Sequence, residues 1–145
     1  MQIVDANVLL YAVNRSSRQH HESRTWLDRS LSGDSAVGFA WVVQMAFLRL
    51  STNPRIFPQP LSIDEATTVL EQWLSAPPAR IVTPTTRHLP IFAELLGATG
   101  SGGNLVNDAH LAALAVEHRA KIITYDTDFA RFPRVAWETP QYSVT

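Results

Sequence analysis

The sequence contains no cysteine, which excludes a disulfide scaffold, a thiolate metal site and a cysteine nucleophile. It also lacks any apolar run near the roughly 18 residues of a membrane-spanning helix, and it has no basic segment followed by an apolar one at its start. Lysine is nearly missing, since Lys121 is the one lysine among 12 basic residues. The net charge of −1 excludes a strong global field for nucleic acid. These absences favour a cytoplasmic protein with no membrane association.

Short β-like runs alternate with longer helical runs, and this pattern is typical of an α/β fold with a parallel sheet. The 145 residues, 46% hydrophobic and 17% charged, suit a single globular domain spanning residues 1–145. We predict a central parallel sheet of about four to five strands, flanked by helices on both faces. The expected strands are 3–5, 36–39, 80–83, 121–124 and an edge strand at 134–137. The expected helices are 7–13, 21–31, 42–50, a Ser62-capped helix to about 74, 87–96 and 106–118, with a mobile glycine-rich loop at 97–103.

Carboxylates recur where the predicted strands end, which is where ligands gather in open α/β sheets. Asp5 closes the first strand, Asp126 and Asp128 follow the strand 121–124, and Asp108 lies in the first turn of the alanine-rich helix. Grouped carboxylates repel one another unless a divalent cation neutralises them. Their hard oxygens suit Mg²⁺ or Mn²⁺ better than Zn²⁺. Such an ion polarises a phosphodiester and activates a water.

Each acid also has a purely structural interpretation. Asp108 suits a helix cap, and Asp126 and Asp128 suit turns, where aspartate bonds its own backbone. Asp5 has the weakest explanation of this kind, because an acid closing an apolar strand is unusual. Taken together the four positions favour an acidic metal site, although their spacing does not name the reaction.

Other candidate sites are weaker. His20 and His21 flank a helix start and His118 lies at a helix end, so structural roles are favoured over zinc binding or acid–base catalysis. The 97–103 loop lacks the lysine and the serine or threonine of a phosphate-binding loop. The four tryptophans suit the core or a subunit interface, or base stacking where exposed. Arg15, Arg18, Arg49 and Arg55 are candidates for contacts with RNA phosphate, with solvated or salt-bridged roles as the alternative.

Four motifs, in order, resemble a known family. They are VDANVLLY at residues 4–11, FLR at 47–49 with TNPR at 52–55, NDAHLAALA at 107–115 and TYDTDF at 124–129. In this order they resemble PIN-domain ribonucleases, in particular the VapC toxins of bacterial VapBC toxin–antitoxin pairs from the actinobacterial branch. The likeness spans nearly the whole chain.

The resemblance implies a function and a set of site residues. It implies the toxin of a type II toxin–antitoxin module, a Mg²⁺- or Mn²⁺-dependent endoribonuclease that hydrolyses RNA phosphodiester bonds by metal-activated water. It also implies a homodimer and a cognate VapB-type antitoxin. By position, Asp5, Asp108 and Asp126 would be the catalytic, metal-binding acids, and Asp128 a further metal-site member. Asn7 and Thr124 match small polar positions that support the site.

One position departs from the family pattern. PIN domains usually carry a glutamate just before the phenylalanine-leucine-arginine run, and here that position is Ala46. Gln44 does not replace it, because residues two apart point to different faces of a helix. We expect Arg49, three residues on, to lie near the vacated face. The loss leaves a second hypothesis open, a catalytically degenerate PIN domain that binds RNA or protein.

A third hypothesis is a phosphoacceptor domain that uses a strand-end aspartate. Its expected companion is a lysine at the end of a strand, where it would contact the phosphoryl group. Lys121 instead begins its predicted strand. The sequence therefore disfavours this hypothesis.

Overall fold

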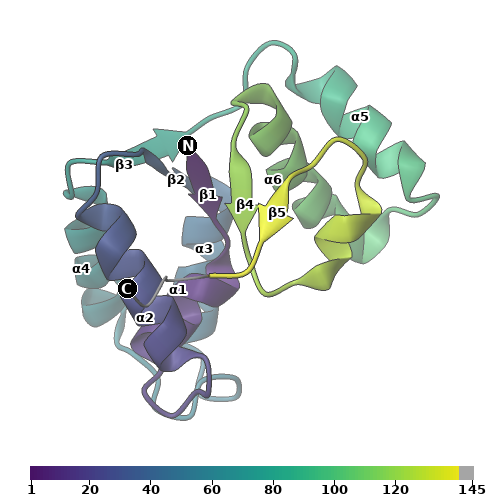
Figure 1. The fold of residues 1–145 in the computed structure, drawn as a ribbon. Helices are drawn as coiled ribbons and strands as arrows, with labels where there is room; N and C mark the ends of the chain where they lie inside the picture. Colours follow the sequence, from purple (N-terminus) through teal and green to yellow (C-terminus); the bar gives the residue numbers. More distant parts are fainter. Residues whose placement is uncertain (141–145) are drawn as a thin grey trace.

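Five parallel strands form one sheet at the centre of the computed structural model, which describes residues 1–140 (Figure 1). The strands are β1 (Gln2–Val4), β2 (Val37–Ala40), β3 (Ala79–Val82), β4 (Lys121–Ile123) and β5 (Trp137–Glu138). Their order is β3-β2-β1-β4-β5, and every neighbouring pair is parallel. Val4 of β1 is in register with Ile123 of β4. The residues that follow these two strands, Asp5 and Thr124, therefore emerge side by side.

Six α-helices and two short 3-10 helices connect the described strands (Figure 1). The helices are α1 (Ala6–Val13), α2 (His20–Leu31), α3 (Trp41–Ser51), α4 (Ile63–Leu74), α5 (His88–Ala98), η1 (Gly103–Leu105), α6 (Val106–Glu117) and η2 (Thr127–Arg131). Helices flank the sheet on both faces; α1 packs on α2 and α3, while α5 packs on α6. The predicted α/β architecture is confirmed. Among the described residues, no helix combines the length and apolar character needed to cross a membrane.

Side-chain caps mark the starts of α1, α4 and η2. The predicted capping box at α4 is confirmed: Ser62 Oγ accepts from Glu65 N at 3.1 Å, and Glu65 Oε1 accepts from Ser62 N at 3.0 Å. Two predictions were wrong in extent. Helix α5 continues through Gly97, because the chain first turns left-handed at Gly100, where φ is 69°. The edge strand begins at Trp137, after a left-handed turn at Arg134.

The core lies where the central strands meet the helices. Ile3, Val4, Ile122 and Ile123 are fully buried in β1 and β4. Gly38 of β2 allows the neighbouring strands to approach, since a Cβ there would lie 2.5 Å from a side-chain carbon of Val82. This apolar centre holds the carboxyl ends of β1 and β4 in place.

The tryptophans divide into two groups. Trp26 is buried, Trp73 packs edge-on against Phe47 with ring centroids 5.2 Å apart, and Trp137 is half-buried. Trp41 differs, because 54% of its surface is exposed at the start of α3.

Candidate metal centre

Asp5 connects the end of β1 to the start of α1. Its Oδ1 accepts a hydrogen bond from Ala6 N at 2.7 Å and so caps α1. Its Oδ2 accepts from Thr124 Oγ1 at 2.8 Å and from Asn7 Nδ2 at 3.3 Å. Both oxygens are thus held by the protein, and the carboxylate has a fixed orientation.

Thr124 and Asn7 connect this carboxylate to the turn after β4. Thr124 Oγ1 also accepts from Asn7 Nδ2 at 3.1 Å and from Asp126 N at 2.9 Å. Asn7 Oδ1 accepts from Tyr125 N at 3.1 Å. Thr124 is fully buried, so its hydroxyl bonds to protein groups and not to bulk solvent. These two residues therefore connect Asp5 with Asp126 through hydrogen bonds.

Three further acids converge beside Asp5. Asp108, Asp126 and Asp128 each place one carboxylate oxygen in a group whose three atoms all lie within 4.8 Å of one another. Asp108 stands in the first turn of α6, and Asp126 caps η2 by accepting from Asp128 N at 2.9 Å. Asp5 is outside this closest group, although its charge still acts on Asp108. The four predicted acids therefore lie together near the carboxyl ends of β1 and β4. Asp5 is beside the closest group of three.

The electrostatics of the cluster favour a cation. Burial raises the pKa of the Asp108 carboxyl to about 7, and the charge of Asp126 adds to the shift. The charges of Asp5 and Asp128 act in the same direction. Burial also raises the pKa of Asp5, against the hydrogen bond from Thr124. A hard divalent ion would relieve this repulsion, so the all-oxygen donor set fits Mg²⁺ or Mn²⁺.

A cavity of about 380 Å³ opens beside Asp5 and Asp108, between α1, α3 and α6. Arg49 is the basic residue in its lining, and Ala46 leaves the α3 side without a carboxylate. Gln44 is buried and donates to Phe39 O at 3.4 Å, so it points into the core. The other lining residues are Ala6, Val42, Val43, Met45, Asn104, Asn107 and Leu111.

The remaining predicted contacts lie elsewhere. Arg15 and Arg18 are exposed in the loop after α1, Arg55 is exposed in the loop after α3, and none of the three lines the cavity. Asn104 and Asn107 were not anticipated from the sequence. The position of Asn107 directly before Asp108 was a usable signal, whereas nothing local marks Asn104.

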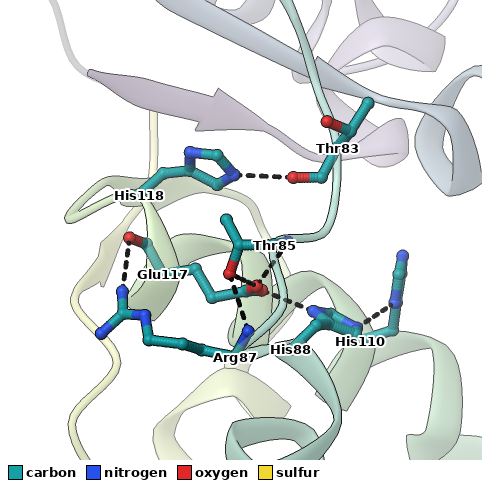
Figure 2. Close-up of polar contacts among 7 residues, drawn as sticks. All are labelled: Thr83, Thr85, Arg87, His88, His110, Glu117 and His118. Atoms are coloured by element: carbon teal, nitrogen blue, oxygen red, sulfur yellow. Dashed lines mark hydrogen bonds and ion pairs between the residues drawn. The ribbon is translucent and has the colours of Figure 1, made fainter.

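A second polar cluster joins α5 to α6 and involves three of the five histidines (Figure 2). Glu117 accepts from the main chain and hydroxyl of Thr85 and pairs with His88 Nδ1. His88 Nε2 contacts His110 Nδ1 at 2.9 Å. His118 ends α6, and its Nε2 lies 2.8 Å from Thr83 O. This network holds two helices together, and its members could not be paired from the sequence because only helix packing brings them into contact.

Comparison with known proteins identifies relatives along nearly the whole chain. The PIN domain family model matches residues 3–135. Ribonuclease VapC37 of Mycobacterium tuberculosis is 58% identical over 140 residues, covering 97% of this chain and 97% of that protein. Ribonuclease VapC33 of the same species is 36% identical over 140 residues, covering 97% and 98%.

Solved structures share the fold at low sequence identity. VapBC2 from Rickettsia felis, bound to a DNA fragment from its promoter, has a TM-score of 0.70 at 19% identity, covering 95% of this chain and 97% of that one. VapC20 of M. tuberculosis, a Sarcin-Ricin loop cleaving toxin, has a TM-score of 0.68 at 16% identity, covering 94% and 99%. From the matching family model, these identities and the shared fold, the chain belongs to the PIN-domain family and to its VapC group.

Proposed function

We propose that residues 1–145 form one PIN domain that acts as a divalent-metal-dependent endoribonuclease, the toxin of a VapBC-type module. The observation that carries this proposal is the convergence of Asp5, Asp108 and Asp126 beside one cavity, with a raised pKa at Asp108. Uncompensated carboxylates of this kind are costly to the fold, which is typical of functional sites. The ribonuclease names of the sequence relatives support the same activity.

The acids would hold the metal. Asp108, Asp126 and Asp128 form the close group, and Asp5 adds a fourth carboxylate at its border. A bound Mg²⁺ or Mn²⁺ supplies charge stabilisation at the phosphodiester and lowers the pKa of an attacking water. Asn7 and Thr124 fix the orientation of Asp5, as groups hydrogen-bonded to metal ligands commonly do.

The cavity wall would bind the RNA. Arg49 offers a guanidinium that pairs with a phosphate in a bidentate manner. Asn104 and Asn107 offer amide groups for base edges or the 2′-hydroxyl. Trp41 and Met45 lie one turn apart on α3, 54% and 56% exposed, and Met45 lines the cavity. Trp41 is therefore a platform on which a splayed base can stack.

A degenerate binding module is the second candidate function, and Ala46 favours it. The α3 side of the cavity contributes no carboxylate, so all the acids that would hold a metal come from the other elements. Titration with Mn²⁺ by calorimetry separates the two: saturable binding in the millimolar range or tighter supports the enzyme. Absence of binding in that range supports the module.

The partners follow from the same assignment. Solved structures with this fold include VapBC assemblies from Rickettsia felis and Salmonella typhimurium. We therefore expect a VapB-type antitoxin, encoded next to this chain, and a homodimer, both acting in the cytoplasm. Co-expression with the product of a small upstream reading frame tests the first, and the mass of the purified chain by light scattering tests the second.

The deciding experiment is RNA cleavage with and without Mn²⁺, using Asp5→Asn as the matched variant. Cleavage by the wild-type chain should require the ion and should be lost in Asp5→Asn, with circular dichroism unchanged. Growth arrest on expression should follow the same pattern. Full toxicity of a well-expressed Asp5→Asn chain would overturn the proposal.

A further inference from the structure

A second cavity, of about 740 Å³, lies at the amino ends of β1 and β4, whereas the acids lie at the carboxyl ends of these strands. Gln2 and Lys121, the first residues of β1 and β4, line it together with the end of α6 and the segment before β5. This is the end of β1 at which the amino terminus is marked in Figure 1. The strand length separates it from Asp5 by about 10 Å. It is therefore distinct from the candidate metal centre.

The lining of this cavity is basic. Arg87, Arg119, Lys121 and Arg134 contribute to it, and no aspartate or glutamate does. Two of these cations have acidic partners outside the lining, Lys121 with Glu138 and Arg134 with Glu94. The Arg134–Glu94 pair is exposed to solvent and the Lys121–Glu138 pair is partly exposed, so water screens both and a ligand can replace the acid in either.

The other two cations have no acidic partner. Arg87 donates to the main-chain carbonyl of Glu117 at 3.2 Å (Figure 2), which also offsets the negative end of the α6 dipole. The guanidinium of Arg119 has no hydrogen-bonding or ionic partner within residues 1–140. The cavity thus keeps uncompensated positive charge in a chain whose net charge is −1.

The backbone adds an independent observation. Arg119 and Arg134, with φ of 53° and 71°, are the two non-glycine residues in the left-handed region within the part of the chain that the structure describes. Arg119 directly follows the C-cap of α6, a position where glycine is the usual residue because it adopts this conformation without strain. Both strained positions carry arginine and both line the same cavity. Strain of this kind is found preferentially at functional sites.

We propose that this cavity binds a phosphate-bearing anion. Arginine forks pair with phosphate oxygens in a bidentate manner, and the volume lies in the range of small-ligand sites. The phosphate belongs either to a free nucleotide or to the backbone of an RNA strand that extends away from the metal centre. Only the second source rests on the proposed ribonuclease function.

The test is Arg119→Gly, measured in EDTA so that neither cleavage nor a bound metal contributes. Adenosine monophosphate and a single-stranded oligouridylate are titrated separately at constant ionic strength. Because glycine relieves the left-handed strain, the variant should melt no lower than the wild type. Its affinity for the anion should nevertheless fall by about tenfold or more, as expected for loss of charge-assisted hydrogen bonds. Arg134→Gly repeats the design at the second position.

Arg24→Gln is the matched control, since it removes one positive charge from an exposed residue of α2 outside the cavity and should leave affinity unchanged. Saturable binding of the monophosphate that Arg119→Gly weakens assigns the cavity to a free nucleotide. Weakening seen with the oligouridylate alone assigns it to RNA phosphates. If neither probe saturates, or if both bind the variant as tightly as the wild type, the proposal is overturned. The monophosphate measurement keeps its meaning even if the chain cleaves no RNA.

Discussion

Thr124 donates a hydrogen bond from Oγ1 to Asp5 Oδ2 at 2.8 Å, across the ends of two neighbouring strands 119 residues apart in the chain. The same hydroxyl accepts from Asn7 Nδ2 and from Asp126 N. One buried oxygen thus connects two of the predicted acids and sets their spacing. The hydrogen bonds of the Thr124 hydroxyl, rather than the size of the side chain, should therefore matter for the site.

Replacing Thr124 by valine keeps the shape of the side chain and removes these hydrogen bonds. We expect Mn²⁺ affinity, measured by calorimetry, to fall by about 10- to 100-fold, as for other groups bonded to metal ligands. Stability should fall by about 1–3 kcal/mol, because buried polar partners lose their hydrogen bonds. Thr124→Ser retains the hydroxyl and should restore most of the affinity. Equal Mn²⁺ binding by the valine and serine variants would contradict a positioning role.

The pH dependence of the metal-free chain should follow from Asp108. Its pKa is raised to about 7 in the folded state, so the folded chain holds this proton more tightly than the unfolded chain does. The resulting stability is fully present below the ordinary aspartate pKa of about 4 and is lost as pH rises through about 7. The melting temperature in EDTA should therefore decline between these values, and Asp108→Asn should flatten the decline.

Metal binding should show the opposite trend, because the ion competes with the proton on Asp108. Mn²⁺ affinity of the wild type should increase as pH rises through about 7. An affinity that is constant from pH 5 to pH 8 would be inconsistent with Asp108 as a ligand of the ion.

Much of the site could be predicted because parallel strands end at a common edge. Asp5 and Thr124 follow neighbouring strands, and local sequence places Asp108 in the first turn of α6. These positions depend on strand and helix signals that single stretches of sequence carry. The contacts of Arg49 with the cavity and of Gln44 with the core follow from helix periodicity in the same way.

Contacts that form only when helices and loops pack together could not be predicted from local sequence signals. The Glu117–His88–His110 network arises because α5 lies against α6, and no local motif encodes that pairing. The basic cavity likewise unites Arg87, Arg119 and Arg134 from segments far apart in the chain. Arg119 and Arg134 adopt the left-handed conformation without the glycine or asparagine that would indicate such a turn in the sequence.

Ala46 is the position at which a further carboxylate could be added to the acids beside the cavity. It lines the same cavity as Asp5 and Asp108, on the α3 side that contributes no acid. Ala46→Glu should add a hard oxygen ligand and tighten Mn²⁺ binding by about tenfold, since ligand charge count tunes affinity. Ala46→Gln, of the same size but neutral, should not. Similar Mn²⁺ affinities for both variants would show that this position does not reach the ion.

Trp41 should contribute to RNA binding and little to folding, because 54% of its surface is exposed. Loss of a stacked base contact costs about 1–3 kcal/mol, so Trp41→Ala should weaken binding of single-stranded RNA by roughly 5- to 150-fold. Trp73→Ala is the matched control, since Trp73 packs against buried Phe47 and its loss should lower stability by several kcal/mol. Binding is measured by fluorescence anisotropy in the Asp5→Asn background, which prevents cleavage, and stability by urea denaturation. If Trp41→Ala binds RNA as the wild type does, bases do not stack on this face of α3, and Arg49 with the two asparagines must account for RNA recognition.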